Sequence, residues 1–244
     1  MHDSSVDALL QARRTRRWLT ALPQAPRDAA EAYAIQDAVA AALGPIGGWK
    51  VGAAGPDAEP ARGAIQKDTL FHDPGQLDGA PLHLIGVEAE LAYTFARDLP
   101  PRATPYSRDE VAAAIGAIHP AIEILDTRFE SLAAVDALSQ RADHNNAGAL
   151  ILGAPLAAWQ SVEPAQQRVR LLLDGALRTE RVGGNAAGDL LRLLVWLANG
   201  GAPGGLRAGD VVTTGSCTGT DFVPRGTKVA VEFPGLTTLT LTIT

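Results

Sequence analysis

The sequence predicts a β-rich α+β fold with N-terminal helices, and three observations support this prediction. Residues up to 48 place apolar side chains at helical spacing. Beyond residue 48, apolar and polar side chains mostly alternate, which is typical of half-buried strands. Helical and strand patterns do not follow one another regularly, and this disfavours a doubly wound parallel sheet. We therefore expect a helical segment at 1–48 and a β-rich domain at 49–244, together forming one globular unit.

Two helices are expected in the first segment. The first covers residues 4–20 and carries the basic run "RRTRR", residues 13–17, which we interpret as a solvated face or a subunit contact. The second begins at a pair typical of a capping box, Asp28 and Glu31. It ends at Gly44, because glycine commonly terminates helices.

The clearest strand covers residues 86–96, "GVEAELAYTFA". Side chains alternate between the two faces of a strand, so one face is apolar and consists of Val87, Ala89, Leu91, Tyr93 and Phe95. The other face consists of Glu88, Glu90, Ala92 and Thr94. The remaining elements are expected to be a helix over 107–116, a strand over 121–125, a hairpin over 168–182, a helix over 188–200, and strands within 210–216 and 228–244.

Composition excludes several classes of protein. The net charge is −6 and the isoelectric point is about 5.3, whereas a nucleic-acid binder needs a basic face. A single cysteine rules out an internal disulfide framework. The sequence shows no signal peptide and no apolar run of transmembrane length. We expect a cytoplasmic protein with no nucleic-acid or membrane partner.

Three glutamates are candidates for a metal site. Glu88 and Glu90 point the same way from one strand, roughly 7 Å apart along it, and Glu123 lies alone on the next expected strand. A solvent-facing strand side is the alternative, but Ala92 and Thr94 complete that face instead of further charges. Carboxylates that converge in a partly buried site repel unless they are protonated or bind a cation. All-oxygen ligand sets favour hard divalent ions such as Mg²⁺ or Mn²⁺.

Five segments in series resemble a known family. They are, in chain order, "GWKVGA", "VEAELAY", "HPAIEILDTRF", "NNAGALILG" and "AGDVVTTGSCTG". Together they resemble the fumarylacetoacetate hydrolase superfamily over about residues 30–244, and its branch of 2-keto-4-pentenoate hydratases and 4-oxalocrotonate decarboxylases in particular. The resemblance implies the mixed β-sandwich roll of that family, with catalysis in the β-rich domain.

The resemblance also implies roles for particular residues. Glu88, Glu90 and Glu123 match the positions that hold one divalent metal in the family. Lys50 matches the lysine near the reacting carbon, where it would transfer a proton if burial and the metal lower its pKa. Its alternative is a surface lysine before a strand. The implied substrate-binding residues are Thr214, Gly215, Ser216 and His144.

Other polar residues of the matching segments have structural alternatives. His119 precedes Pro120 on the way into the Glu123 strand, so a structural role is as well supported as a place in the pocket. Asp126 and Arg128 follow that strand, where they support the site or form a local ion pair.

One departure from the family pattern concerns an acid that the hydratases carry between the lysine and the glutamate strand. Ala61 and Arg62 stand where an Asp-Phe step is expected. Asp57, Glu59 and Asp68 are the candidates to replace this acid. The departure bears on hydration more than on the metal site.

The segment "GSCTG", residues 215–219, contains the single cysteine in a pattern typical of a nucleophile elbow. An elbow needs a helix after its turn, but Pro224 and Gly226 follow and then alternation resumes. No histidine follows His144 to complete a triad. We therefore interpret Cys217 as a small residue in a tight loop beside the site.

These observations lead to two classes of function. The first is a metal-dependent lyase that hydrates a short 2-oxo acid or a 2-hydroxydienoate, as in aromatic-ring degradation, with decarboxylation or hydrolytic C–C cleavage as alternatives. The second is a non-catalytic protein that binds a metal and a 2-oxo acid. In either case the partner is a small molecule, and we expect a homo-oligomer.

Overall fold

Two mixed β-sheets make up the body of the chain in the computed structural model, which describes residues 3–244. The strands of the larger sheet are β1 (Ile46–Gly52), β2 (Ala61–Gln66), β3 (Leu70–His72), β5 (Gly86–Phe95), β6 (Ile115–Leu125), β7 (Ala147–Leu152), β10 (Val211–Thr213) and β11 (Asp221–Phe222). The strands of the smaller sheet are β4 (Gln76–Leu77), β8 (Arg168–Leu173), β9 (Ala176–Val182), β12 (Lys228–Glu232) and β13 (Leu239–Ile243).

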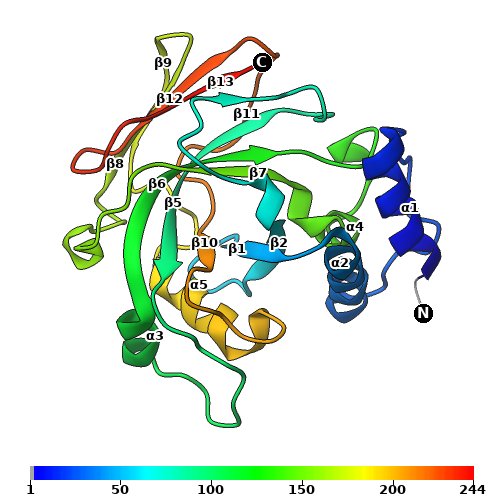
Figure 1. Cartoon of the computed structure of the whole chain (residues 1–244), viewed down its shortest axis with the longest axis horizontal. Coiled ribbons are helices and arrows are strands. Elements are labelled where there is room, and N and C mark those ends of the chain that lie inside the picture. Colours follow the sequence, from blue (N-terminus) through cyan, green and yellow to red (C-terminus); the bar gives the residue numbers. More distant parts are fainter. Residues whose placement is uncertain (1–2) are drawn as a thin grey trace.

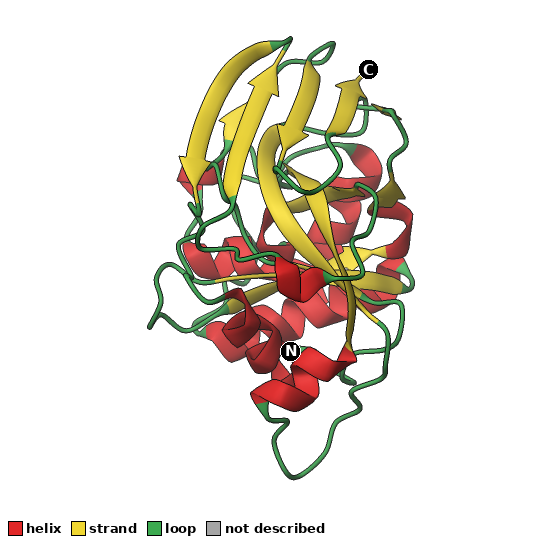
Figure 2. Ribbon diagram, turned by 90° about the vertical axis from the view of Figure 1, so that its left-hand side faces the viewer, coloured by secondary structure: helices red, strands yellow, loops and turns green. Residues whose placement is uncertain are grey.

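Five α-helices accompany these sheets in the described part of the chain. They are α1 (Asp3–Thr15), α2 (Ala29–Leu43), α3 (Arg108–Ala114), α4 (Ala137–Ala142) and α5 (Leu190–Trp196), and α5 continues into a π-helical turn over Leu197–Gly201. Figure 1 shows α1, α2 and α4 together beside one end of the larger sheet, with α3 and α5 at the other. In Figure 2 the strands of the smaller sheet lie at the top and most helices lie in the lower half.

The larger sheet is organised around a long antiparallel pair, β5 and β6. Its strand order is β2-β1-β10-β5-β6-β7-β3, with β11 also paired to β5, and the smaller sheet has the order β4-β13-β12-β8-β9. Most pairs are antiparallel, but β1 with β10, β3 with β7 and β4 with β13 are parallel. The expected β-rich α+β fold is confirmed.

The alternation predicted for β5 is also confirmed. The face from Val87 to Phe95 is buried in the main hydrophobic core between the sheets and helices. This burial aims the opposite face, with Glu88 and Glu90, away from the core. A capping box of Ser107 and Glu110 begins α3.

Two expected boundaries are wrong. The first helix ends at Thr15, because Arg16 adopts a positive φ of 56° and Leu19 then pairs with Phe129. The strand expected over 121–125 begins at Ile115. Proline has no amide hydrogen to donate to a neighbouring strand. The Pro120 carbonyl accepts from the Gly153 amide just beyond the last β6–β7 pair, so the missing donor lies where the pairing of these strands ends.

The basic run is not uniformly solvated. Arg13 forms an ion pair with the buried Asp143 at 3.2 Å and is 21% exposed. Helix α2 ends at Leu43 and β1 begins at Ile46, close to the expected boundary at residue 48. The division into two units stays a prediction. Within residues 3–244, the helices are too short or too polar to cross a bilayer.

Candidate metal-binding site

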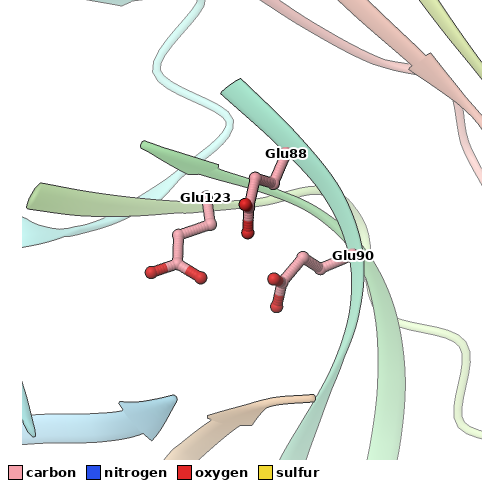
Figure 3. A group of neighbouring side chains, drawn as sticks. All are labelled: Glu88, Glu90 and Glu123. Carbon is pink, nitrogen blue, oxygen red and sulfur yellow. The ribbon is translucent and has the colours of Figure 1, made fainter. Parts of the chain in front are cut away.

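The three candidate glutamates converge. Glu88 and Glu90 extend from β5, and Glu123 extends from β6, where it lies directly opposite Glu88 in the strand register. One carboxylate oxygen from each lies within 4.8 Å of those of the other two. Figure 3 shows the three carboxylates pointing into a shared space. Since Glu90 is 0%, Glu123 1% and Glu88 9% exposed, the alternative of a solvent-facing strand side is wrong.

Hydrogen bonds hold these carboxylates but leave two oxygens free. One oxygen of Glu90 accepts from the Thr213 hydroxyl and, at 3.0 Å, from the Gly215 amide. Lys50 donates to one oxygen of Glu123. Glu90 Oε1 and Glu123 Oε2 are buried without any hydrogen-bond partner. Buried polar atoms rarely lack a partner, and two such carboxylate oxygens in one cluster of three glutamates fit a divalent cation.

The pKa values in the site reflect the burial of three carboxylates close together. Burial, followed by the charges of Glu123 and Glu88, raises the pKa of Glu90 well above its ordinary value. Burial also raises the pKa of Glu123. For Lys50, burial lowers the pKa, but the three carboxylates outweigh burial and leave the pKa above its ordinary value. Proton transfer by Lys50 is expected if burial and the metal together lower this pKa. Burial alone does not achieve this here, and the effect of a metal stays a prediction.

The metal-free protein should lose stability as the pH rises above 4.5, the ordinary pKa of a glutamate. A carboxyl whose folded-state pKa is raised binds its proton more tightly in the folded state. Its stabilising contribution is therefore present below the unfolded pKa and is lost as the pH climbs through the folded pKa. Thermal unfolding in EDTA from pH 4.5 to 8 measures this trend, which saturating Mg²⁺ should remove.

Glu90→Gln removes one of the repelling charges and serves as the matched variant. We expect its metal-free melting temperature at pH 8 to exceed that of the unmodified chain by at least about 2 °C, the shift that 1 kcal/mol produces at this size. A lower melting temperature for Glu90→Gln in EDTA would show that repulsion among the three carboxylates does not destabilise the metal-free protein.

A cavity of about 260 Å³ opens onto the three carboxylates. Besides them, its lining includes Lys50, Glu59, Ala61, Arg141, Asn145 and Gly215. The volume is below the roughly 300–1,000 Å³ of pockets for drug-sized ligands, so the cavity suits a short acid. Sequence reasoning missed Arg141 and Asn145. Asn145 lies within the family-like segment "NNAGALILG", which was a usable signal, whereas nothing in the sequence around Arg141 pointed to the site.

The four implied substrate-binding residues are placed differently from one another. Gly215 lines the cavity, whereas the buried Thr214 turns its hydroxyl to the Leu91 carbonyl at 2.7 Å. The Ser216 hydroxyl accepts from the Gly219 amide within its own loop. His144 is buried with Nδ1 3.0 Å from the Ala64 carbonyl. Only Gly215 of these four reaches the cavity lining, and their roles toward a substrate stay predictions.

A strained turn places Asn145 in the cavity wall. His144, Asn145 and Asn146 have φ angles of 53°, 54° and 61°. This left-handed conformation is costly for most residues other than glycine, and Asn and His tolerate it better than most. Gly63 on β2 lets this turn approach, because a Cβ atom there would lie 2.1 Å from the His144 carbonyl oxygen and 2.9 Å from Lys50 Cγ. Glycine at 63 therefore positions both the turn and the lysine.

Buried ion pairs stabilise the chain next to this turn at residues 144–146. Arg128 donates to Asp143 at 2.6 Å and lies 3.6 Å from Asp126, so the local ion pair expected for Asp126 and Arg128 is confirmed. The structural interpretation of His119 fits as well, because its ring nitrogens contact Thr94 at 2.8 Å and the Gly153 carbonyl at 2.9 Å.

Of the three acids named as replacements for the missing one, Glu59 alone lines the cavity, together with Ala61. Its carboxylate accepts from the Trp196 indole at 2.7 Å. Arg62 does not face the site. It is buried, and it donates to Gln36 at 2.7 Å and to Asp37 at 2.9 Å.

Cys217 is not built as a nucleophile. It is 2% exposed, and its amide donates to the Ala89 carbonyl at 2.8 Å. Burial, followed by the charge of Glu90, raises the pKa of the thiol to about 12, whereas reactive thiols have a lowered pKa. The short strand β11, not a helix, follows the loop. The rejection of a nucleophile elbow is confirmed.

Cys217→Ser should retain turnover within about threefold, because a hydroxyl replaces a thiol that does no chemistry and the buried volume barely changes. Steady-state kinetics at equal Mg²⁺ saturation measures this. A loss of about three orders of magnitude with intact metal binding would contradict the structural role.

Comparison with known proteins agrees with this geometry. The sequence model of the family described as fumarylacetoacetate (FAA) hydrolase C-terminal matches residues 63–244. The chain is 29% identical over 208 residues to a 2-keto-4-pentenoate hydratase of Burkholderia vietnamiensis, a match that covers 81% of this chain and 78% of the relative. It is 27% identical over 188 residues to a 4-oxalocrotonate decarboxylase of a Pseudomonas species, covering 75% and 70% of the two chains.

A solved structure shares the fold. The 4-oxalocrotonate decarboxylase of Pseudomonas putida G7, complexed with magnesium and adipate, matches with a TM-score of 0.85 at 22% identity. The match covers 98% of this chain and 95% of that one. The predicted type of mixed β-sandwich roll is thereby confirmed.

Proposed function

The chain belongs to the fumarylacetoacetate hydrolase family, and from this premise we propose that it is a divalent-metal-dependent lyase. Its proposed reaction is the hydration of a short 2-oxo acid or 2-hydroxydienoate such as 2-keto-4-pentenoate. The relatives named as hydratases, at 29% identity, support this choice of reaction. Such a reaction belongs to the degradation of aromatic compounds.

The observation that carries the proposal is the convergence of three buried carboxylates beside one lysine in a single cavity. We assign the metal to Glu88, Glu90 and Glu123, whose free oxygens fit it. When bound there, a divalent cation supplies Lewis-acid stabilisation of the negative charge that develops on the 2-oxo oxygen. Magnesium is the ion named with the related solved structure, and Mn²⁺ offers the same coordination chemistry.

Lys50 moves the proton at C3 in this proposal. Its ammonium already donates to Glu123, so it lies beside the ligand set and therefore beside a substrate chelated there. A divalent cation among the carboxylates offsets the charges that hold the Lys50 pKa high. Lys50 then gives up and recovers a proton more readily. Gly215 fixes Glu90 through its amide and forms part of the cavity wall.

Decarboxylation of a 2-oxo acid is the second candidate, and Ala61 is the observation that favours it. Ala61 lines the cavity, at the position where the resemblance to the hydratases implies an acid. Decarboxylation needs the metal to take up charge on the oxo oxygen but needs no group to activate water. A relative named as a decarboxylase, at 27% identity, supports this candidate. Hydrolytic C–C cleavage and non-catalytic binding of the metal with an oxo acid are the further alternatives.

Product analysis distinguishes these candidates. We expect the Mg²⁺-loaded protein to convert a 2-hydroxydienoate into a 4-hydroxy-2-oxo acid, which ¹H NMR identifies by the new CH–OH signal. Release of CO₂ from a 2-oxo-3-enedioate without water addition would select the decarboxylase. The absence of any product from either acid would leave only the hydrolase and the non-catalytic binder.

We further propose a cytoplasmic location and a homo-oligomeric state. The acidic charge and the lack of a membrane-spanning helix within residues 3–244 are compatible with the first. Sedimentation analysis of the purified chain tests the second.

A further inference from the structure

One segment of the chain, residues 213–220, holds two of the three glutamates. It joins β10 to β11, and both of these strands pair with β5. At its first residue the Thr213 hydroxyl donates to one oxygen of Glu90. At its last residue the Thr220 hydroxyl donates to one oxygen of Glu88. The segment therefore fixes how both glutamates of β5 present their carboxylates.

Strand register places Thr213 for its contact. Thr213 lies opposite Lys50 of β1 on one side and opposite Ala92 of β5 on the other. Directly paired residues share a face of a sheet, and so do residues two apart on one strand. Because Ala92 is two residues from Glu90, the Thr213 side chain lies on the face that carries Glu90 and Lys50. Thr213 is 0% exposed, so water does not compete for its hydroxyl.

The hydrogen bonds at two of the glutamates occupy one oxygen and leave the other free. On Glu90, the Thr213 hydroxyl and the Gly215 amide both donate to Oε2, and Oε1 is buried without a partner. On Glu123, Lys50 donates to Oε1, and Oε2 is buried without a partner. Each of these carboxylates is therefore set to give a cation a single oxygen.

The number of oxygens that each carboxylate gives separates small divalent cations from large ones. Mg²⁺ demands octahedral coordination by about six oxygens at short distances, and several of these are usually water. Ca²⁺ takes about six to eight oxygens at longer distances and commonly binds a carboxylate through both of its oxygens. Carboxylates held to one oxygen each therefore suit Mg²⁺ and supply too few ligands for Ca²⁺.

We propose that Thr213 is a positioning residue that makes the site selective for Mg²⁺ over Ca²⁺. Together with the Gly215 amide it holds Oε2 of Glu90, so that this glutamate does not bind an ion through both oxygens. The inference rests on the proposed function, because the metal must lie among Glu88, Glu90 and Glu123. It goes further by naming the side chain that determines which ion is held.

Calorimetric titration of the metal-free chain with Mg²⁺ and, separately, with Ca²⁺ at one pH tests this inference. The unmodified chain should bind Mg²⁺ more tightly. Thr213→Val removes the hydroxyl and keeps the branched shape, and its Mg²⁺ affinity should fall by about 10–100-fold, the usual cost of removing a group that supports a metal ligand. Its Ca²⁺ affinity should fall much less, because Ca²⁺ gains the second oxygen of Glu90. The ratio of the two affinities should therefore shift toward Ca²⁺ by at least about fivefold.

Two further variants separate selectivity from folding. Thr213→Ser keeps the hydroxyl and should keep the ratio of the unmodified chain. Thr214→Val is the matched control, because Thr214 is equally buried but its hydroxyl donates to the Leu91 carbonyl at 2.7 Å instead of a carboxylate. It should lose a buried hydrogen bond without a change in the ratio. Melting temperatures in EDTA show which variants fold, and if Thr213→Val does not, Thr213→Ala should show the same shift.

Several results would overturn the inference. An equal loss of both ions in Thr213→Val would make the threonine merely structural. A preference of the unmodified chain for Ca²⁺, or an equal shift in Thr214→Val, would also contradict it. If the unmodified chain binds neither ion, or if Glu90→Ala binds both normally, the metal assignment in the proposed function fails and the inference falls with it.

Discussion

Lys50→Ala should exchange the C3 protons of a 2-oxo acid at least a hundredfold more slowly than the unmodified chain. A positioned acid–base group contributes about 10²–10⁴-fold to proton transfer, and Lys50 is the lysine that lines the cavity. The binding of oxalate with Mg²⁺ should remain near normal, because chelation uses the carboxylates. The binding of Mg²⁺ alone should not weaken, since Lys50 competes with the cation for Glu123.

Exchange into D₂O, followed by ¹H NMR, measures this effect, and calorimetry with oxalate separates chemistry from binding. Lys67→Ala is the matched control because Lys67 is exposed and outside the cavity. Fast exchange in Lys50→Ala would show that Lys50 only balances charge. The proton would then have to move through another group, and Glu59 would be the first to test.

Glu90→Ala should abolish Mg²⁺ binding, with a loss of at least about a hundredfold in affinity. Substitution of groups that merely support metal ligands already costs 10–100-fold, and Glu90 is the most buried of the three carboxylates. Calorimetric titration of the unmodified chain should show one site per chain. Turnover should fall together with metal binding.

Glu59→Gln is the matched control for this prediction. Glu59 is a carboxylate of the same cavity but lies outside the three-glutamate cluster, and glutamine can still accept from Trp196. Its affinity for Mg²⁺ should be unchanged within about threefold. Normal Mg²⁺ binding in Glu90→Ala would mean that the metal lies elsewhere.

The metal cluster was predictable because a strand imposes its own geometry. Alternation along residues 86–96 aims Glu88 and Glu90 to one side, and an apolar opposite face tells which side is away from the core. The sequence could not supply the register that places Glu123 opposite Glu88. The burial of the three glutamates could not be predicted from the sequence either, since a Glu-x-Glu pair on a strand is more often exposed than covered by other elements.

Other parts of the site depend on contacts between elements that lie far apart in the chain. Arg141 reaches the cavity only because α4 packs against α2, where Tyr33 meets its guanidinium. The left-handed turn at His144 is held by Asp143, whose partners Arg13 and Arg128 come from distant segments. No periodicity encodes such contacts. The net rise of the Lys50 pKa likewise follows from three carboxylates brought together by folding.

Exchange of the C3 protons of 2-oxobutyrate in D₂O by the unmodified chain, with Mg²⁺ and with EDTA, tests whether metal and lysine act together on a 2-oxo acid. We expect the C3 signal to disappear in the presence of protein and Mg²⁺ and to persist in EDTA, because the carboxylate cluster and Lys50 enolise the acid only together with the metal. Persistence of the C3 signal while Mg²⁺ and oxalate bind would contradict this expectation, and would leave a protein that holds its metal and its oxo acid without moving a proton.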